Sequence, residues 1–272
     1  MTDLLEPVRA HYRASDLVER LRTALAVLGP EDERLLPQQL GGLDQFHTRG
    51  VAATLEIATL AGIAADTTVL DAGCGLGGPA RLLAATYGCR VAGVDLSESF
   101  VEAARYLTER TGQSGQVWFQ AGSALELPFE RGAFDVALLQ HVAMNIADRD
   151  RLYRELRRIL RPGGRLAVFD VVAAGGEPFF PVPWGRTAET SFLLTAAETR
   201  DAVERVGFRT TAWRDDTEAA KAWFFELRAS GPPPTPNLGQ VISPDFPELA
   251  ANLGRNLMEG RLGILTAVFT AA

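Results

Sequence analysis

The sequence predicts an α/β fold, in which helices cover both faces of a mostly parallel sheet. From Val69 to Val172, short runs rich in β-branched residues alternate with helical runs, and repeated alternation of this kind is typical of a parallel sheet. The first β-rich run, "TVLDAG", passes directly into a glycine-rich turn and a helix. In open sheets of this class, such a turn lies at the carboxyl edge, where ligands bind.

Helices are expected before this core. Leu17 and Leu21 begin a series of leucines near the 3.6-residue period of an amphipathic helix, and a second helix is expected over residues 50–61. We therefore predict that residues 1–65 form an N-terminal helical lid and that residues 66–272 form the ligand-binding domain.

The core segments alternate strand with helix along the chain. In order they read "TVLDAG", "PARLLAATYG", "RVAGVDLS", "ESFVEAARYLTERTG", "QVWFQAGS", "FDVALLQHV", "DRLYRELRRILRPGG" and "RLAVFDVV". Pro79 falls in the first turn of one helix and "RPGG" closes another, so the helix ends are marked by the residues that favour them.

A stretch rich in proline and aromatic residues interrupts the alternation at about residues 173–194, and we expect a loop insertion there. Beyond it, helices are predicted over 196–206, 217–227 and 246–258, and strands over 208–213 and 264–269. A long excursion separates the last two strands, so they could close the sheet as an antiparallel edge.

Composition limits the classes of partner. The chain has 272 residues, 47% of them hydrophobic, which is enough for one sizeable core. Its net charge of -7 disfavours nucleic acid and anionic membranes, and the run "RDRLYRELRRILR" is better explained as a solvated helix face. Without a signal-peptide pattern or a long apolar run, we expect a cytoplasmic protein that binds no membrane.

The stretch "VLDAGCGLGGPARLLA" places Gly73, Gly75 and Gly78 in a G-x-G-x-x-G spacing. That spacing suits NAD and S-adenosylmethionine equally and is weak evidence alone. Asp71 separates them, because a carboxylate at the end of the first strand would repel a pyrophosphate and attract the cationic amino-acid tail of S-adenosylmethionine. Asp95 closes the next strand and is placed to accept both ribose hydroxyls.

Residues 69–172 resemble the class I S-adenosylmethionine-dependent methyltransferases. "VLDAGCGLGG" is similar to their first motif, "VAGVDLS" to their ribose-binding segment, "AGSALELPFERGAFDV" to their adenine segment and fourth strand, and "ILRPGGRLAVFD" to their turn into strand five. The resemblance implies a Rossmann-like, seven-stranded, mostly parallel sheet with the insertion after strand five. Together, motif and resemblance give the predicted cofactor-binding residues: Asp71, Gly73, Cys74, Gly75, Asp95, Leu96, Ser123, Ala124 and Gln140.

Ser123 departs from the family pattern, because an aspartate usually stands at this position and accepts the adenine amino group. A serine hydroxyl can accept the same hydrogen bond without charge. The assignment of an S-adenosylmethionine site therefore holds, with weaker binding expected.

A narrower resemblance spans most of the chain. "LGGLDQFHTRG", "LLQHVAMNIADRDRLYRELRRILRPGG", "FPVPWGR" and "ANLGRNLMEGRLG" are together similar to the bacterial sarcosine and dimethylglycine N-methyltransferase group. This implies a small-molecule substrate, with N-methylation of an amino acid or amine as the leading hypothesis. Because fold does not carry substrate with it, O- or C-methylation of a natural product in secondary metabolism is the alternative. A catalytically silent cofactor-binding protein is a further alternative.

Two histidines are candidate catalytic residues. An in-line methyl transfer needs an aligned nucleophile and the exclusion of water, and a hydroxyl or carbon acid also needs a base. His141 and Gln140 close the fourth strand and face the crevice, where His141 could act as a base, orient the acceptor or be structural. His47, in "DQFH", is the second candidate if the N-terminal helices cover the site.

The candidate substrate-binding residues come from three regions. They are Gln45 and Phe46 beside His47, Met144 and Asn145 after strand four, Trp184 and Arg186 in the insertion, and Arg261 near the end. An aromatic face suits a pocket wall, and an arginine suits a substrate carboxylate, although core packing and solvated arginines explain them as well. The cysteines lack zinc-site spacing, so we predict no metal; a homo-oligomer is possible.

Overall fold

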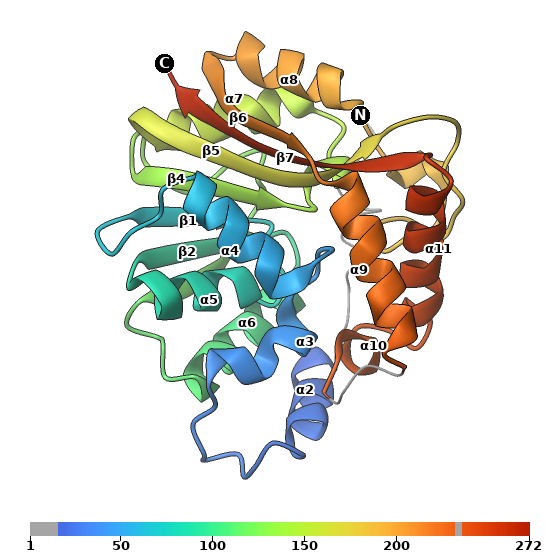
Figure 1. Ribbon diagram of the computed structural model, residues 1–272. Coiled ribbons are helices and arrows are strands. Elements are labelled where there is room, and N and C mark those ends of the chain that lie inside the picture. The colour runs from blue at the N-terminus through green and yellow to red at the C-terminus, as the bar shows by residue number, and fades with distance from the viewer. Residues whose placement is uncertain (1–15, 232–235) are drawn as a thin grey trace.

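The structure is a computed structural model that describes residues 16–231 and 236–272. These residues form a seven-stranded sheet in the order β3-β2-β1-β4-β5-β7-β6, covered by helices on both faces (Figure 1). The strands are β1 (Thr68–Ala72), β2 (Arg90–Asp95), β3 (Val117–Ala121), β4 (Phe134–Gln140), β5 (Leu160–Ala173), β6 (Phe208–Asp215) and β7 (Leu262–Ala271). The predicted α/β class with a mostly parallel sheet is confirmed.

Strand β7 is the antiparallel member of the sheet. Strands β1 to β5 pair in parallel, whereas β7 runs antiparallel to both β5 and β6. The sequence led us to expect that the last two strands close the sheet as an antiparallel edge, and the structure confirms it: β6 and β7 pair antiparallel, with β6 outermost and β7 between β5 and β6. Nearly all of β7 is buried, while β6 alternates between buried and exposed positions, and continuous burial is what an interior strand requires.

Helices divide between the two faces of the sheet. On one face lie α4 (Gly50–Leu60), α5 (Gly78–Tyr87) and α6 (Glu98–Arg110), together with α9 (Thr217–Ala229) and α11 (Phe246–Met258). On the other lie α7 (Arg149–Ile159) and α8 (Ala196–Arg205). Neighbouring side chains of β1 point to opposite faces of the sheet: Val69 packs in the core under α4, α5 and α6, and Leu70 packs in the core under α7 and α8.

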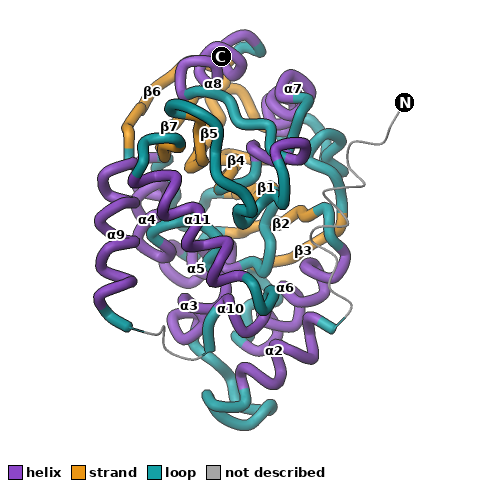
Figure 2. Tube along the Cα trace, turned by 90° about the vertical axis from the view of Figure 1, so that its right-hand side faces the viewer, coloured by secondary structure: helices purple, strands orange, loops and turns teal. Residues whose placement is uncertain are grey.

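A cap is built from both ends of the described chain. Helix α2 (Leu17–Leu25), the 3₁₀ turn η1 (Pro37–Leu40) and α3 (Gly41–Asp44) share one apolar cluster with α10 (Leu238–Val241). Figure 2 shows α10 beside α2 and α3, and α11 adjoins α10. By contrast, the expected helix at 50–61 is α4, which packs on the sheet. Within the described residues 16–65, the residue that lines the pocket described below is Phe46, in the segment that leads into α4; residues 1–15 of the expected lid lie outside the described residues.

One buried ion pair joins the cap to the core. Arg81 on α5 is fully buried and its Nη2 donates to Asp44 Oδ2 at 2.8 Å and to the carbonyl of Leu76 at 2.6 Å. Glycine is required at position 78 for this approach, because a Cβ there would lie 2.1 Å from the carbonyl oxygen of Asp44. The start of α5 and the end of α3 are thus held in direct contact.

The insertion after β5 is fixed on α11. The amide of Asn256, which is fully buried, accepts from the Phe179 N–H at 2.8 Å and donates to the Phe179 carbonyl at 2.9 Å. Asn252 donates to the carbonyl of Pro181 at 2.8 Å. The 3₁₀ turns η2 (Ala143–Asn145) and η3 (Ala188–Thr190) complete the description.

Replacing Arg81 by Met tests the ion pair. It leaves the Asp44 carboxylate buried without its partner, so we expect the free energy of unfolding to fall by about 3–5 kcal/mol, measured by urea denaturation. Arg154→Met is the matched control: it breaks an ion pair with Asp150 in which the arginine side chain is 69% exposed, and it should change that energy by less than about 1 kcal/mol. Equally small losses in both variants would contradict a buried pair that holds the cap.

Candidate active site

A pocket lies at the carboxyl ends of β1, β2 and β4, the edge at which open α/β sheets bind ligands. Its wall includes Gly73 and Gly75 after β1, Asp95 and Leu96 at the end of β2, and residues 122–125 after β3. Phe46 and Phe100 cover one side, and their rings meet edge to face at 5.7 Å. The cap therefore contributes directly to the pocket wall.

The glycine-rich loop is drawn tightly against its neighbours. Gly73 has a φ of 78°, and a Cβ there would lie 2.4 Å from Val142 Cγ2, so this position needs glycine for both conformation and space. The N–H groups of Gly73 and Cys74 donate to the carbonyl of Val94 at 2.7 and 3.1 Å. The Cys74 thiol is buried among core residues and does not line the pocket, so a ligand there would meet only the Cys74 backbone.

Asp95 ties the end of β2 to the glycine-rich loop. Its Oδ2 accepts the Gly75 N–H and its Oδ1 accepts the Ser97 N–H, both at 2.9 Å. Burial raises the pKa of this carboxyl, and these backbone hydrogen bonds counteract the rise. Each carboxylate oxygen keeps a further lone pair, so Asp95 can also accept hydroxyl groups from a ligand in the pocket.

Asp71 is a buried carboxylate with unmet hydrogen-bonding capacity. Among the described residues, its Oδ2 has no hydrogen-bond partner, which is costly for a buried polar atom. Burial, and then the nearby charge of Asp95, raise the pKa of Asp71 to about 7. A cationic ligand would relieve both effects, whereas the pyrophosphate of NAD would worsen them. The site therefore fits S-adenosylmethionine, which carries an ammonium group and a sulfonium.

Ser123 and Ala124 lie in the pocket wall, as expected of residues that flank an adenine. The Ser123 hydroxyl oxygen already accepts the Leu125 N–H at 3.1 Å. Its second lone pair is the acceptor that the aspartate of the family pattern would otherwise supply.

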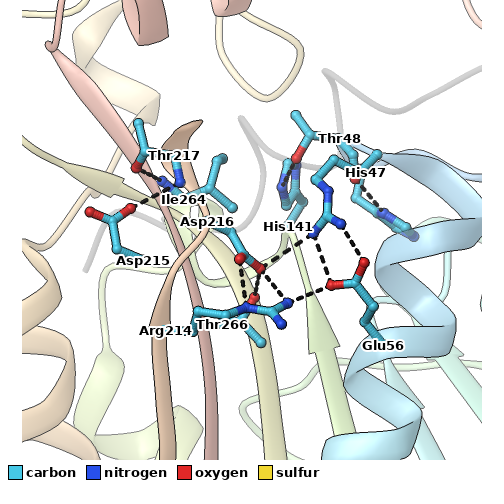
Figure 3. Close-up of polar contacts among 11 residues, drawn as sticks. His47, Thr48, Glu56, His141, Arg214, Asp215, Asp216, Thr217, Ile264 and Thr266 are labelled. Atoms are coloured by element: carbon cyan, nitrogen blue, oxygen red, sulfur yellow. Dashed lines mark hydrogen bonds and ion pairs between the residues drawn. The ribbon is translucent and has the colours of Figure 1, made fainter. Parts of the chain in front are cut away.

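His141 forms the far wall of the pocket. It follows β4 in a left-handed conformation with a φ of 53°, its N–H donates to the Phe169 carbonyl at 2.9 Å, and its ring stacks on that of Phe169 with centroids 5.3 Å apart. The His141 Nε2 lies 3.4 Å from Thr48 Oγ1, as Figure 3 shows. Desolvation, and then the charge of His47, lower the pKa of His141 well below its ordinary value, so the imidazole is neutral near pH 7.

His47 lies behind His141, with ring centroids 6.1 Å apart. Its Nδ1 is 3.1 Å from the Thr48 carbonyl and its Nε2 is 3.1 Å from Gln45 Oε1; both of these oxygens can only accept, so the single N–H of a neutral ring can bond to one of them at a time. The Thr54 hydroxyl and the Gln140 amide lie 3.1 and 3.4 Å from that Nε2. Burial lowers the pKa of His47 to about 4, so this histidine is neutral as well.

Gln45, Phe46 and Gln140 were expected at the site, and the structure divides them. Phe46 and Gln140 line the pocket. Gln45 is buried beside His47, with its Oε1 at 3.1 Å from both His47 Nε2 and the Thr54 hydroxyl. Gln45 and His47 therefore support the wall from behind.

The loop after β4 is held by Asp170, a residue that the sequence reasoning missed. Its Oδ2 accepts the Ala143 N–H at 2.8 Å and its Oδ1 accepts the Val171 N–H at 2.9 Å. Burial raises the pKa of Asp170 to about 6. The available signal was the single acid within the apolar run "RLAVFDVV". Asn145 on this loop lines the pocket as expected, whereas Met144 is buried in the core.

Three other candidates do not reach the pocket wall, which corrects their predicted roles. Trp184 is buried in the core beneath the insertion, where its Nε1 donates to Ser191 Oγ at 2.9 Å. Arg186 pairs with Asp245 on the surface. Arg261 lies over the Phe179 ring, with 4.0 Å from its guanidinium carbon to the ring centroid. Arg186 and Arg261 are each held by a partner that is distant in sequence, whereas the partner of Trp184 lies within the same insertion.

Residues 16–231 and 236–272 contain no group of three or more histidine, cysteine or acidic residues that could hold a metal ion. None of the helices in those residues is both long and apolar enough to cross a membrane.

Comparison with known proteins agrees with the geometry. Residues 70–168 match the family described as "Methyltransferase domain". The chain is 35% identical over 133 residues to the methyltransferase GfsG of Streptomyces halstedii, covering 49% of this chain and 48% of that protein. It is 30% identical over 164 residues to the O-methyltransferase resE of Aspergillus sclerotiorum, covering 60% and 62%. The chain thus spans less than two thirds of the length of these relatives.

The expected resemblance to the sarcosine group is also found. A glycine/sarcosine/dimethylglycine N-methyltransferase of Actinopolyspora halophila is 36% identical over 138 residues, covering 49% of this chain and 24% of that protein. Among solved structures, geranyl diphosphate C-methyltransferase from Streptomyces coelicolor superposes with a TM-score of 0.73 at 18% identity, covering 100% of this chain and 99% of that one. Residues 70–168 thus match the methyltransferase domain family, and the chain shares its fold with this solved C-methyltransferase.

The raised pKa of Asp71 predicts a pH-dependent cofactor affinity. Below about pH 7 the carboxyl holds a proton that a cationic ligand must displace, so affinity for S-adenosylmethionine should fall by up to about tenfold per pH unit from pH 7 to pH 5. Calorimetric titration over that range measures the slope. Asp71→Asn is the control, and it should bind more weakly with little pH dependence. A flat profile in the unaltered protein would contradict the assignment.

Replacing Asp95 by Ala should weaken binding of S-adenosylhomocysteine by about tenfold or more, because hydrogen bonds to a charged group are worth about 1.5–3 kcal/mol. Calorimetry measures this constant. Ser123→Ala provides a comparison within the same pocket: it removes a neutral hydroxyl and should cost only about 0.5–1.5 kcal/mol. A larger loss from Ser123→Ala than from Asp95→Ala would reverse the predicted roles.

Proposed function

We propose that this protein is an S-adenosylmethionine-dependent methyltransferase that acts on a hydroxyl group or an acidic carbon of a small, largely apolar molecule. The observation that carries the proposal is a neutral His141 in the pocket wall at the end of β4. A neutral imidazole always keeps one nitrogen with an unshared lone pair. A base at this place is what hydroxyl and carbon acceptors require and what a neutral amine does not.

The pocket wall disfavours an amino acid as the acceptor. Among the described residues that line it, none is an arginine or a lysine, and Arg186 and Arg261 are held elsewhere. A substrate carboxylate would therefore lose its water without gaining a cationic partner. The leading hypothesis from the sequence was N-methylation of an amino acid or amine. The missing cation argues against the amino acid, and the candidate base His141 favours a hydroxyl or carbon acceptor over an amine, so we propose O- or C-methylation of a natural product.

The relatives include proteins named for oxygen, carbon and nitrogen methylation, so they allow this choice and do not decide it. Besides the O-methyltransferase resE, they include a sterol 24-C-methyltransferase of Saccharomyces cerevisiae, which is 34% identical over 116 residues, covering 43% of this chain and 30% of that protein. The names of these proteins specify oxygen and carbon acceptors.

We assign cofactor binding, exclusion of water and proton transfer to different residues at the site. When bound, S-adenosylmethionine supplies an electrophilic methyl group. Asp71 pairs with the positive end of the ligand, and Asp95 accepts from its hydroxyls. Phe46 covers the pocket and excludes water. The free ring nitrogen of His141, which Phe169 holds by stacking, would take the proton of the acceptor oxygen or carbon, while the sulfur–methyl bond of the cofactor would break with its electron pair left on sulfur and the methyl would pass to the acceptor.

Replacing His141 by Asn tests the base. Asparagine tolerates the left-handed backbone of this position, so the change removes the imidazole with little strain. We expect turnover of a hydroxyl or carbon acceptor to fall on the order of 10²-fold or more, while affinity for S-adenosylhomocysteine changes less than about twofold because Asp71 and Asp95 are untouched.

The assay needs an acceptor, which we would find by mass spectrometry of a pool of phenols, aliphatic alcohols, enolisable ketones and amines incubated with the protein and S-adenosylmethionine. Methylation confined to amines, with His141→Asn fully active, would overturn the proposed chemistry. Absence of transfer to every class would count against the proposed activity itself.

A further inference from the structure

Arg49 has an unusual backbone conformation beside the candidate base. We use the term strap for residues 45–48, which lead from the cap into α4. Arg49 follows the strap as the residue that caps α4, with a φ of 62°. Residues other than glycine rarely adopt this left-handed backbone conformation, because their Cβ crowds the backbone. Such a residue persists only where the surroundings hold it in place.

The side chain of Arg49 supplies that hold. Its Nη1 donates to Glu56 Oε2 at 3.2 Å and its Nη2 donates to Glu56 Oε1, which makes a two-pronged contact with α4. The same Nη1 lies 3.4 Å from Asp216 Oδ2. Arg214 completes the cluster, with Nη2 at 2.5 Å from Glu56 Oε2 and Nε at 2.6 Å from Asp216 Oδ1. Two cations and two carboxylates are thus balanced in one place.

Asp216 is the fixed point of this cluster. Its carboxylate is 5% exposed, its N–H donates to the Ile264 carbonyl at 2.8 Å, and its Oδ2 accepts from the Thr266 hydroxyl. Thr217 adds a link, since its hydroxyl oxygen accepts the Ile264 N–H at 3.0 Å. Figure 3 shows these groups converging at the start of α9 and on β7. The sheet itself therefore sets the position of the Asp216 carboxylate.

The strap connects this cluster to His141. Thr48 directly precedes Arg49 and is buried, with its hydroxyl 3.4 Å from His141 Nε2 and its carbonyl 3.1 Å from His47 Nδ1. Arg49 itself does not line the pocket. Its side chain can influence the chemistry only through the neighbouring strap.

We propose that Arg49 is a positioning residue, whose guanidinium bridges Glu56 and Asp216 and thereby sets Thr48 and His47 against His141. This inference rests on the proposed function for its effect on turnover, but the arrangement of the two histidines can be tested without any acceptor. A two-pronged, planar contact carries geometric information that a single point charge lacks. Lysine at this position should therefore be a poor substitute.

Two variants distinguish a positioning role of Arg49 from an effect on stability or on backbone strain. Arg49→Lys keeps the positive charge and loses the two-pronged contact with Glu56. Arg49→Gly removes the side chain and also relieves the unfavourable φ, so a purely local strain effect would make this variant no worse than the original. Val203→Ala is the control for general loosening, because Val203 is buried on α8, on the opposite face of the sheet.

Imidazole nitrogen NMR is the primary measurement, because the chain contains only three histidines. Single His→Asn variants assign the signals. In the original protein, His47 should show the signals of a neutral ring. Both Arg49 variants should shift the His47 and His141 signals or mix their tautomers, whereas Val203→Ala should not. Affinity for S-adenosylhomocysteine should stay within about twofold in all three variants, since the glycine-rich loop and Asp95 are untouched.

With an acceptor identified as above, Arg49→Lys should lower kcat about tenfold and leave the KM for the acceptor within about twofold, because misplaced groups affect the reacting geometry more than binding. Unchanged imidazole signals in Arg49→Gly would overturn the positioning role, whatever the activity. Shifted signals with no transfer to any acceptor would support the positioning of the histidines and count against the proposed function alone.

If Arg49→Gly does not fold, Glu56→Gln gives the same readout from a side chain that is 38% exposed. This variant removes the charge from the carboxylate that receives both prongs of the fork, and it should move the same two imidazole signals. No movement of either signal would contradict the proposal.

Discussion

The buried ion pair between Asp44 and Arg81 is the contact on which the arrangement of the pocket depends. The guanidinium group of Arg81 reaches the end of α3, the Leu76 carbonyl in the glycine-rich loop, and the Ala104 carbonyl and Thr108 hydroxyl on α6. A charged pair removed from water needs hydrogen bonds to offset its lost solvation; both Nη groups of Arg81 have them, whereas its Nε has no partner among the described residues. Because this one side chain joins the cap, the loop and α6, Phe46 and the glycine-rich loop keep a fixed separation across the pocket.

The pocket is divided electrostatically along its length. Asp95 lies in the wall at one end, and Asp71, which does not line the pocket, is buried near Asp95; burial raises the pKa of both carboxyls, and a cation gains most from such a place. At the other end, the two histidines are kept neutral by the same desolvation. A positively charged group is therefore favoured at the first end, and an uncharged acceptor at the second. One physical effect, the exclusion of water, produces both preferences.

The similarity to other proteins is concentrated in the half of the molecule that binds the cofactor. Relatives named for oxygen, nitrogen and carbon methylation share this core. What differs between acceptors must come from the elements around it, which here are the strap, the loop after β4 and the insertion. These elements are held by contacts of their own: Arg49 with Glu56 and Asp216, Asp170 with the loop after β4, and Asn256 with the insertion.

The sequence by itself determined the α/β class, the glycine-rich loop and the positions of Asp71 and Asp95, because each depends on residues close together in the chain. Local periodicity also placed the helix at residues 246–258 with the observed bounds. Only the tertiary structure decided which distant side chains meet. Arg186 and Arg261 have the right chemistry for a carboxylate, yet Asp245 and Phe179 hold them away from the pocket. The fold brings Arg49 and Asp216 together although they lie 167 positions apart in the chain. No short-range sequence pattern predicts a contact between residues so far apart.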